Sequence, residues 1–280
     1  MDNFDIKLAR KDDLKEFIPL IDVEESGLEF INLIEDKDEN LYLLKLDDKN
    51  IGIACIDIED DEFYFYIYIF KEYRNKGYGT FMLKYIEDKF KNSSSKQLLG
   101  AYNMHCELSK HFLTKNGYSF SFGTTCMKFT GTKFEEPDLP IRQYKDEDFD
   151  EAFLVTSEAL NLSRLRTGCF PDSKPDQPKE DSREKWKNTA NDRFVIEMNG
   201  EIVGFSMIDE DELGIVTIKI SHHNQGLGKK LVKYMTNLLI ERGVNEPILW
   251  CLIGNDNARH IYKSLGYNEI IWEGYAEKKF

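Results

Sequence analysis

Two short glycine-bearing segments constrain the fold of this chain more than any other feature. Residues 74–79 read RNKGYG and residues 223–228 read HNQGLG, at a fixed offset (226 − 77 = 149). A later Gly-Tyr dipeptide keeps the same offset, at Gly117 and again at Gly266. One such segment would be weak evidence, but two copies with a shared downstream marker indicate that a folding unit of about half the chain is duplicated.

Each segment follows a β-rich run and opens an amphipathic helix, which is a geometry suited to anions. Glycine lets the backbone turn sharply and brings bare N–H groups close to a ligand. The helix N-terminus adds partial positive charge, so a diphosphate is a natural guest. The pattern R/Q-x-x-G-x-G lacks the Gly-Lys-Ser/Thr of a P-loop and the third glycine of a dinucleotide fingerprint. A strand-to-helix turn without a ligand is the alternative interpretation.

This loop resembles the pyrophosphate loop of the GNAT superfamily of acetyl-CoA-dependent N-acetyltransferases. The resemblance implies an α/β fold of two tandem GNAT-like domains, each a mixed, mostly antiparallel sheet flanked by helices. We expect the N-terminal domain over residues 1–135 and the C-terminal domain over residues 136–280. The stretch 131–140, which contains Pro137 and Pro140, reads as the linker between them.

The two halves present their expected elements in the same order. In the first half, strands are expected at Leu41–Leu46, Ile51–Ile58, Phe63–Phe70 and Leu98–Tyr102. In the second half, they are expected at Phe194–Met198, Ile202–Ile208, Leu213–Ile220 and Ile248–Ile253. The second half departs at Ser163–Asn191, which is rich in proline and charge. The resemblance implies an acceptor-recognition insert there, and a solvated surface loop is the alternative.

Charge limits the classes of partner. The net charge is −14 and the pI is near 4.9, which argues against nucleic acid or an anionic membrane surface. A cationic acceptor such as an amine or polyamine is favoured, although acidity also serves solubility alone. The longest conspicuous apolar run, Phe63–Phe70, is too short to cross a bilayer.

Cysteine and histidine usage points to a reducing compartment without a metal site. The five cysteines are odd in number, scattered and free of any C-x-x-C pattern, so we expect a cytoplasmic protein. The five histidines show no metal-ligand spacing, so no metal is expected. The start of the chain, Met1–Asp5, is acidic and lacks an apolar core, so no secretory leader is expected.

The most specific resemblance lies at residues 255–267, which read NDNARHIYKSLGY. This stretch resembles the GNAT signature N-x-x-A-x-x-x-Y-x-x-x-G-F/Y. The resemblance implies that Asn255 contacts coenzyme A and that Tyr262 is the general acid for the leaving thiolate. Ala258 and Tyr262 are four residues apart and share a helix face, which suits a small residue beside a cofactor-facing phenol. A core aromatic residue is the alternative interpretation of Tyr262.

Glu212 stands at the position of the glutamate base in histone-acetylating members of the family, although a plain turn carboxylate is the alternative. Backbone groups of Ile218 and Ile220 are expected to bind the pantetheine arm in the manner of an added strand. The remaining predicted coenzyme A contacts are His223, Gln225, Gly226, Leu227, Gly228 and Lys229 in the second half, and Arg74, Gly77 and Gly79 in the first. His223 replaces the usual Arg or Gln of the motif.

The first half lacks these catalytic groups. The 149-residue offset places Cys106, Ser109 and Leu113 at the positions of the signature Asn, Ala and Tyr, and Phe63 at that of Glu212. This division resembles tandem GNAT proteins of the mycothiol-synthase type, in which the C-terminal copy is catalytic.

We therefore expect an N-acetyltransferase that carries the acetyl group of acetyl-CoA directly to a primary amine of a small molecule or peptide, in its C-terminal domain. One alternative is a non-catalytic acyl-CoA-binding or sensing protein. Another is an aminoacyl-tRNA-dependent transferase, against which the two pyrophosphate loops and the acidity both count. The oligomeric state and the acceptor's identity are not encoded in any pattern we recognise.

Overall fold

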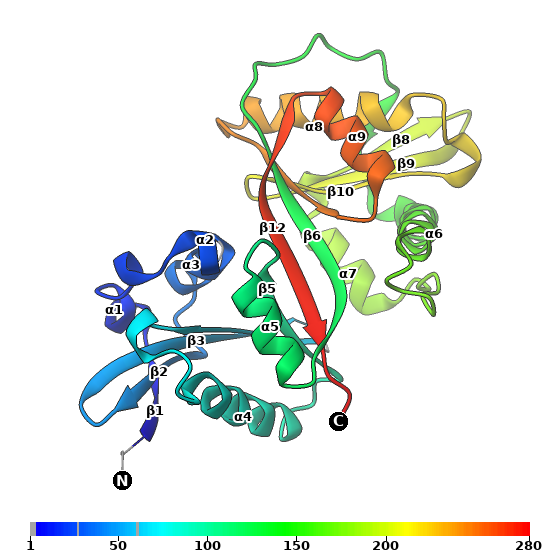
Figure 1. Cartoon of the computed structure of the whole chain (residues 1–280). Coiled ribbons are helices and arrows are strands. Elements are labelled where there is room, and N and C mark those ends of the chain that lie inside the picture. Colours follow the sequence, from blue (N-terminus) through cyan, green and yellow to red (C-terminus); the bar gives the residue numbers. More distant parts are fainter. Residues whose placement is uncertain (1–3, 27, 60–61) are drawn as a thin grey trace. The chain divides into compact units, whose positions relative to one another are not determined.

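The computed structural model describes residues 4–26, 28–59 and 62–280, and resolves them into two compact units (Figure 1). Unit 1 comprises Met1–Gly123 together with Ile271–Phe280, and unit 2 comprises Thr124–Ile270. Residues 1–3, where the acidic start of the chain lies, are outside the described residues.

Unit 1 is a mixed sheet with helices on both faces. Its strands are β1 (Phe4–Ala9), β2 (Leu41–Leu46), β3 (Lys49–Glu59), β4 (Glu62–Ile69), β5 (Gln97–Asn103) and the end of β12 (Tyr267–Glu277), in that spatial order. Among the described residues of unit 1, β4 and β5 pair in parallel, whereas β1–β2, β2–β3, β3–β4 and β5–β12 pair antiparallel. Its α-helices are α1 (Lys11–Leu14), α2 (Val23–Ser26), α3 (Leu28–Asp36), α4 (Tyr78–Lys91) and α5 (Glu107–Lys115).

Alternation along β4 decides which helices cover which face of unit 1. Phe63 and Phe65 pack into a cluster with α4 and α5, whereas Tyr66 and Tyr68 pack with Phe30 of α3 on the other side. We call the second side the α1–α3 face.

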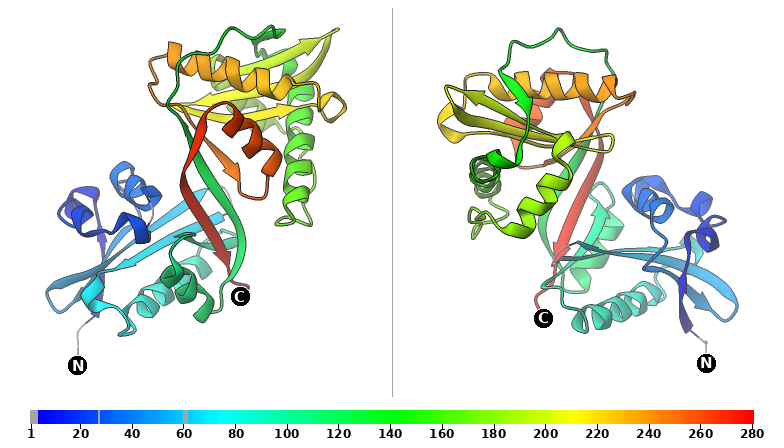
Figure 2. Two further views of the ribbon diagram at one scale, coloured as in Figure 1. Left: turned by 45° about the horizontal axis from the view of Figure 1, so that its top comes forward. Right: turned by 180° about the vertical axis from the view of Figure 1, so that it is seen from behind.

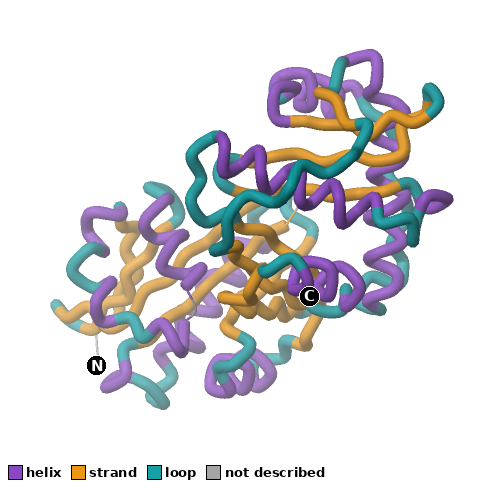
Figure 3. The backbone as a smooth tube through the Cα atoms, turned by 90° about the horizontal axis from the view of Figure 1, so that it is seen from above, coloured by secondary structure: helices purple, strands orange, loops and turns teal. Residues whose placement is uncertain are grey.

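Unit 2 repeats the arrangement. Its strands run β7 (Ile141–Gln143), β8 (Arg193–Met198), β9 (Glu201–Asp209), β10 (Glu212–Ile218), β11 (Ile248–Leu252) and β6 (Ser119–Phe129). Its α-helices are α6 (Phe149–Thr167), α7 (Glu180–Asn188), α8 (Leu227–Glu241) and α9 (Asp256–Ser264). Helices α6 and α7 pack on one face, and α8 and α9 on the other (Figure 2). Figure 3 shows the strands in orange with the helices, in purple, beside them.

Short 3-10 helices complete the elements. They are Ile18–Leu20, Lys71–Tyr73 (η2), Asp146–Asp148, Ala190–Asp192 and Ile220–His222 (η5). The tandem, mixed-sheet GNAT-like fold expected from the repeat is confirmed.

The final strands are exchanged between the sequence halves. The second half of β6 pairs with β11 in unit 2, and the second half of β12 pairs with β5 in unit 1. The compact units therefore divide the chain twice, within β6 and within β12.

Two expectations about elements need correction. The strand expected at Leu213–Ile220 ends at Ile218, because Ile220–His222 closes a 3-10 turn through His222 N–H donating to the Lys219 carbonyl. The expected loop Ser163–Asn191 is partly helical. Helix α6 continues to Thr167, and α7 buries Trp186 against the ring of Phe205, with ring centroids 4.4 Å apart.

The linker expected over residues 131–140 has no helix or strand, and it docks along α8. The side chain of Asn237 accepts a hydrogen bond from Phe134 N–H (2.7 Å) and donates one to its carbonyl (3.0 Å). Lys230 Nζ donates to the Asp138 carbonyl at 3.0 Å. The linker therefore follows α8 toward its N-terminus.

The described residues were compared with three kinds of feature: membrane-spanning helices, metal sites and disulfides. No helix there has both the length and the apolar character needed to cross a membrane. No three or more His, Cys, Asp or Glu side chains there gather into a metal site. All five cysteines are free thiols.

Candidate active site

The two glycine loops have the same backbone geometry. In unit 2 the chain leaves β10, makes the η5 turn, and passes through Asn224 (φ 62°) to Gly226 (φ 77°), which caps α8. In unit 1 it leaves β4, makes the η2 turn, and passes through Asn75 (φ 60°) to Gly77 (φ 89°), which caps α4. Two left-handed residues at matched positions turn each strand sharply into a helix.

Both loops present free backbone donors. Within the described chain, the N–H groups of residues 225–229 and of residues 76–80 donate to no protein acceptor. The first helical bonds begin one residue later, at Lys230 and Phe81. Five consecutive N–H groups at a helix N-terminus form an anion site of the kind predicted from the motif.

Gly226 and Gly77 are required by their positive φ rather than by packing, whereas Gly79 is required by packing. A Cβ on Gly226 or Gly77 would meet nothing within 4 Å, and a Cβ on Gly228 would meet Ile218 at an ordinary 3.7 Å. In unit 1, a Cβ on Gly79 would crowd the Phe112 ring at 3.1 Å. Gln225 and Lys229 are exposed on the unit 2 loop, whereas Leu227 turns into the core.

The first motif position anchors the loop to its own strand. In unit 2, His223 Nε2 lies 2.8 Å from the Ile218 carbonyl. In unit 1, Arg74 Nε donates to the equivalent Ile69 carbonyl at 2.8 Å. His223 therefore replaces the arginine in this contact, and the departure from the motif leaves the loop geometry intact.

A cavity of about 330 Å³ adjoins the unit 2 loop. It is lined by Gly226, Lys229, Lys230, Lys233, Glu135, Glu136 and Pro137. Lys230 and Lys233 were not among the predicted contacts. The spacing of Lys233 from Lys229 could have revealed it, since residues four apart share a helix face, whereas Lys230 is adjacent to Lys229 and has no such signal. The docked linker that brings Glu135 and Glu136 to this place has no such signature.

Next to the loop, β10 and β11 separate. They pair in parallel at Glu212 and Ile248, after which β10 continues along β9 and β11 along β6. A register shift between Leu213 and Val216 gives β10 one more residue than β9, which is a β-bulge. In unit 1, β4 follows β3 without a shift. Bulges commonly re-aim side chains beside active sites.

Because of the bulge, the residue of unit 1 that is equivalent to Glu212 differs from the one given by the 149-residue offset. Glu212 lies opposite Asp209 and Ile248, whereas Tyr64 lies opposite Asp57 and Leu99. The counterpart of Glu212 in unit 1 is therefore Tyr64, and the alignment with Phe63 was wrong. The inserted residue in β10 breaks the 149-residue offset on the N-terminal side of the bulge.

Tyr262 lies on α9, packed against the α8 side of the sheet. Its ring is 6.1 Å from that of Tyr267, and within the described chain its hydroxyl has no hydrogen-bond partner. Burial raises its pKa, and the neighbouring Cys251 and Tyr267 raise it further. The phenol therefore stays protonated at neutral pH. Burial also raises the pKa of the Cys251 thiol to about 12, so this sulfur is not a nucleophile.

Asn255 is engaged within the protein. Its Oδ1 accepts from Ala258 N–H at 3.3 Å and caps α9, and its Nδ2 donates to Ser163 Oγ of α6 at 3.0 Å. The amide thus fixes the start of the helix that carries Tyr262 against α6.

Glu212 opens β10 at the last point where β10 and β11 pair. Its neighbour Leu213 packs with α8, so Glu212 faces the α6–α7 side of the sheet. Tyr262 and Glu212 therefore belong to opposite faces of the sheet, one on each side of the gap. Ile218 ends the strand and is buried, whereas Ile220 is 43% exposed in the η5 turn.

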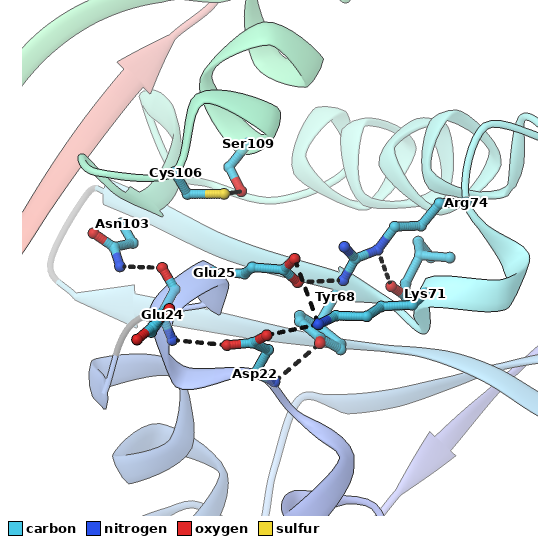
Figure 4. A network of polar contacts seen from close by, with 10 residues as sticks. Asp22, Glu24, Glu25, Tyr68, Lys71, Arg74, Asn103, Cys106 and Ser109 are labelled. Carbon is cyan, nitrogen blue, oxygen red and sulfur yellow. Dashed lines mark hydrogen bonds and ion pairs between the residues drawn. The ribbon is translucent and has the colours of Figure 1, made fainter.

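Unit 1 has an equivalent glycine loop, but the side chains around it differ from those in unit 2. Carboxylates of the α2 segment engage its cations, with Arg74 Nη2 at 2.7 Å from Glu25 and Lys71 Nζ at 2.7 Å from Asp22 (Figure 4). On α5, Ser109 Oγ donates to Cys106 Sγ at 3.3 Å. Leu113, at the position of Tyr262, is buried in the core. The acid of unit 2 is thus absent from α5.

Each unit thus combines parallel strands that separate with a glycine loop that turns the chain into a helix N-terminus. A family model described as acetyltransferase (GNAT) family matches residues 8–118 and 159–267. The chain belongs to this family.

Known proteins resemble the chain in part or in whole. Over 82 residues it is 33% identical to the ribosomal protein bS18 alanine N-acetyltransferase of Escherichia coli K12, covering 27% of this chain and 54% of that protein. The chain thus spans about half the length of the curated relatives it matches.

Two solved structures share the fold. A GCN5-related N-acetyltransferase from Sphaerobacter thermophilus has a TM-score of 0.73 at 16% identity, with 98% of this chain and 95% of that chain covered. A tandem GNAT protein from the clavulanic acid biosynthesis pathway has a TM-score of 0.58 at 9% identity, with 98% of both chains covered.

Proposed function

We propose that the chain transfers the acetyl group of acetyl-CoA to a primary amine of a small molecule or peptide, directly and within unit 2. The observation that carries this proposal is the gap between β10 and β11. On one face of this gap lies the Tyr262 phenol, which has no hydrogen-bond partner among the described residues; a carboxylate lies on the other face, and the anion loop is at its end.

The loop and its lysines hold the donor. The free N–H groups of residues 225–229 suit a diphosphate, and Lys229, Lys230 and Lys233 add positive charge beside them. We assign backbone groups at Ile218 and Ile220 to the pantetheine arm. Asn255 fixes the start of α9, the helix that carries Tyr262. Bound acetyl-CoA supplies the acetyl group as an activated thioester.

Glu212 and Tyr262, on the two sides of the gap, each carry out one of the two proton transfers that the reaction needs. A primary amine has a pKa near ~10 and is protonated at neutral pH, so a base must take its proton before attack. Glu212 has this role on the α6–α7 face. Tyr262, kept protonated by burial, donates a proton to the leaving thiolate from the α8–α9 face.

The acceptor class follows from charge and from the relatives. A net charge of −14 attracts cationic amines toward the protein. The curated relative acts on an alanine of a ribosomal protein, and a free α-amino group on a peptide is the corresponding acceptor for this chain. A reducing, cytoplasmic location fits five free thiols.

The test is steady-state coenzyme A release with acetyl-CoA and either an alanine-initiated peptide or spermidine. Tyr262→Phe should lower kcat about a hundredfold, the scale of a lost general acid, with little change in KM for acetyl-CoA. Tyr234→Phe is the matched control, because Tyr234 is a half-buried tyrosine of α8 in the same unit. Equal kcat for both variants would remove Tyr262 from the chemistry.

A further inference from the structure

Unit 1 contains a buried carboxylate that the proposed chemistry in unit 2 does not use. Glu273 of β12 is 4% exposed. Its Oε1 accepts a hydrogen bond from the Tyr66 hydroxyl at 2.7 Å, and its Oε2 accepts one from the Tyr275 hydroxyl at 2.6 Å. Among the described residues no lysine or arginine forms an ion pair with it. The charge of this carboxylate is thus supported by neutral donors alone.

Its position matches the place where the unit 1 sheet opens. Strands β4 and β5 pair up to Phe65 and Gly100, and beyond this point β5 continues along β12. Glu273 lies opposite Asn103, the last residue of β5, and its partner Tyr66 is the first residue of β4 past the paired stretch. The Glu273–Tyr66 bond therefore spans the opening on the α1–α3 face.

Strand β12, which joins the unit 1 sheet from the second half of the sequence, brings Glu273 to unit 1, and unit 2 has no carboxylate at the equivalent position of β6. The residue of β6 in the equivalent register, opposite Leu252, is Thr124. Conversely, the position of Glu212 in unit 1 is Tyr64, whose ring is 5.5 Å from that of Tyr275. Each unit thus carries a strand carboxylate on the corresponding face of its opening, on β10 in unit 2 and on β12 in unit 1.

We propose that unit 1 is a second acetyl-transfer centre, in which Glu273 binds a primary ammonium group and accepts its proton. The proposal rests on acetyl-CoA being the donor, as proposed above. The ammonium gives one proton to the Glu273 carboxylate, and the nitrogen lone pair attacks the thioester carbon. The C–N bond forms, the C–S bond breaks, and the thiolate takes the second proton from nitrogen. Glu273 then releases its proton to solvent.

Electrostatics around the carboxylate suit this exchange. Burial raises the pKa of Glu273 to about 7, the hydrogen bonds from Tyr275 and Tyr66 oppose that rise, and Glu29 of α3 adds to it. A base is most effective when its pKa is near the working pH. These three residues are the titratable groups that face Glu273, from β12, β4 and α3.

Helix α2 covers this end of the opening through polar contacts. Asn103 Nδ2 donates to the Glu24 carbonyl at 2.9 Å, and Asp22 N–H donates to the Tyr68 hydroxyl at 2.9 Å (Figure 4). No residue of α2 is buried. The cover contributed by α2 is therefore polar, whereas Tyr66 beside Glu273 stacks on Phe30 of α3, so an acceptor reaches the carboxylate from the α2 side.

The first test is direct binding to the full chain with ¹³C-labelled glutamate carboxyls. The resonance that disappears in Glu273→Gln is assigned to Glu273. Titration with n-butylammonium should shift it saturably, whereas uncharged butan-1-ol should not. The shift should persist in Gly226→Val, which blocks only the unit 2 loop. Equal responses to both probes, or none to either, would overturn the amine site.

The second test is turnover in the Gly226→Val background, so that the residual acetylation of n-butylamine belongs to unit 1. Glu273→Gln should lower it at least tenfold. Tyr275→Phe keeps the carboxylate but removes one donor, so the midpoint of the pH–rate profile should move upward. Residual turnover that is indifferent to Glu273→Gln, or absent altogether, would overturn the second centre. Tyr262→Phe in the Gly77→Val background, which blocks the unit 1 loop, reports on unit 2 alone, and its failure would count only against unit 2.

Discussion

His223 and Arg74 are different side chains with one function. Each joins the first loop position to the carbonyl of the last residue of the preceding strand, at 2.8 Å in both units. From the sequence alone, His223 departs from the motif, because the motif does not show which atom the side chain at its first position bonds. The structure gives the physical reason why either an imidazole or a guanidinium suffices.

This equivalence makes a prediction about the unit 2 loop. His223→Arg should keep acetyl-CoA affinity, because arginine makes the same bond in unit 1. His223→Leu should weaken affinity roughly fivefold, the equivalent of about 1 kcal/mol for one lost hydrogen bond. Calorimetric titration of both variants measures it. Equal losses for the two substitutions would show that His223 serves the ligand rather than the loop.

Glu273 makes stability depend on pH. Burial raises its pKa from 4.5 to about 7 in the folded chain. Between these values the folded protein holds a proton that the unfolded chain has released. Stability should therefore fall as pH rises from about 4.5 to about 7, by about 3 kcal/mol, and stay level above that.

Urea denaturation of wild type and Glu273→Gln at pH 5 and pH 8 measures this contribution. The variant should lose less stability than wild type on going to pH 8, because glutamine has no proton to release. Glu107→Gln, an exposed acid of the same unit, should behave as wild type. A Glu273→Gln protein with the wild-type pH dependence would contradict the account.

At the scale of elements, the strand and helix order was predictable and the local irregularities were not. Periodicity and turn residues located β2, β3, β8 and β9 to within about two residues. The bulge in β10 was hidden because one inserted residue leaves the composition of a strand unchanged. Helix α7 was also missed, because prolines and charges surround its one buried anchor, Trp186.

The docked linker gives a prediction at this scale. Asn237, 4% exposed, holds both backbone groups of Phe134, so Asn237→Ala should cost about 1–3 kcal/mol of unfolding free energy. Proteolytic cleavage within residues 131–140 should become faster. Asn92→Ala removes a similar bond from an exposed helix end and should cost less than about 0.5 kcal/mol. Equal costs would mean that the linker is not held by Asn237.

At the scale of the whole molecule, the repeat predicted two units but not the exchange of their last strands. Internal similarity aligns Glu273 with Thr124 and says nothing about which sheet either strand joins. That choice depends on tertiary pairing. It matters for function, because it places a carboxylate from the second sequence half in the first unit.

The central claim is that the unit 2 loop binds the donor, and calorimetric titration with acetyl-CoA tests it most directly. Gly226→Val and Gly200→Val form a matched set, since both glycines belong to unit 2, have φ near 77° and have no atom within 4 Å of a built Cβ. The account predicts that Gly200→Val binds as many molecules of acetyl-CoA as the wild type and that Gly226→Val binds one fewer. A Gly226→Val protein that titrates like Gly200→Val would contradict it.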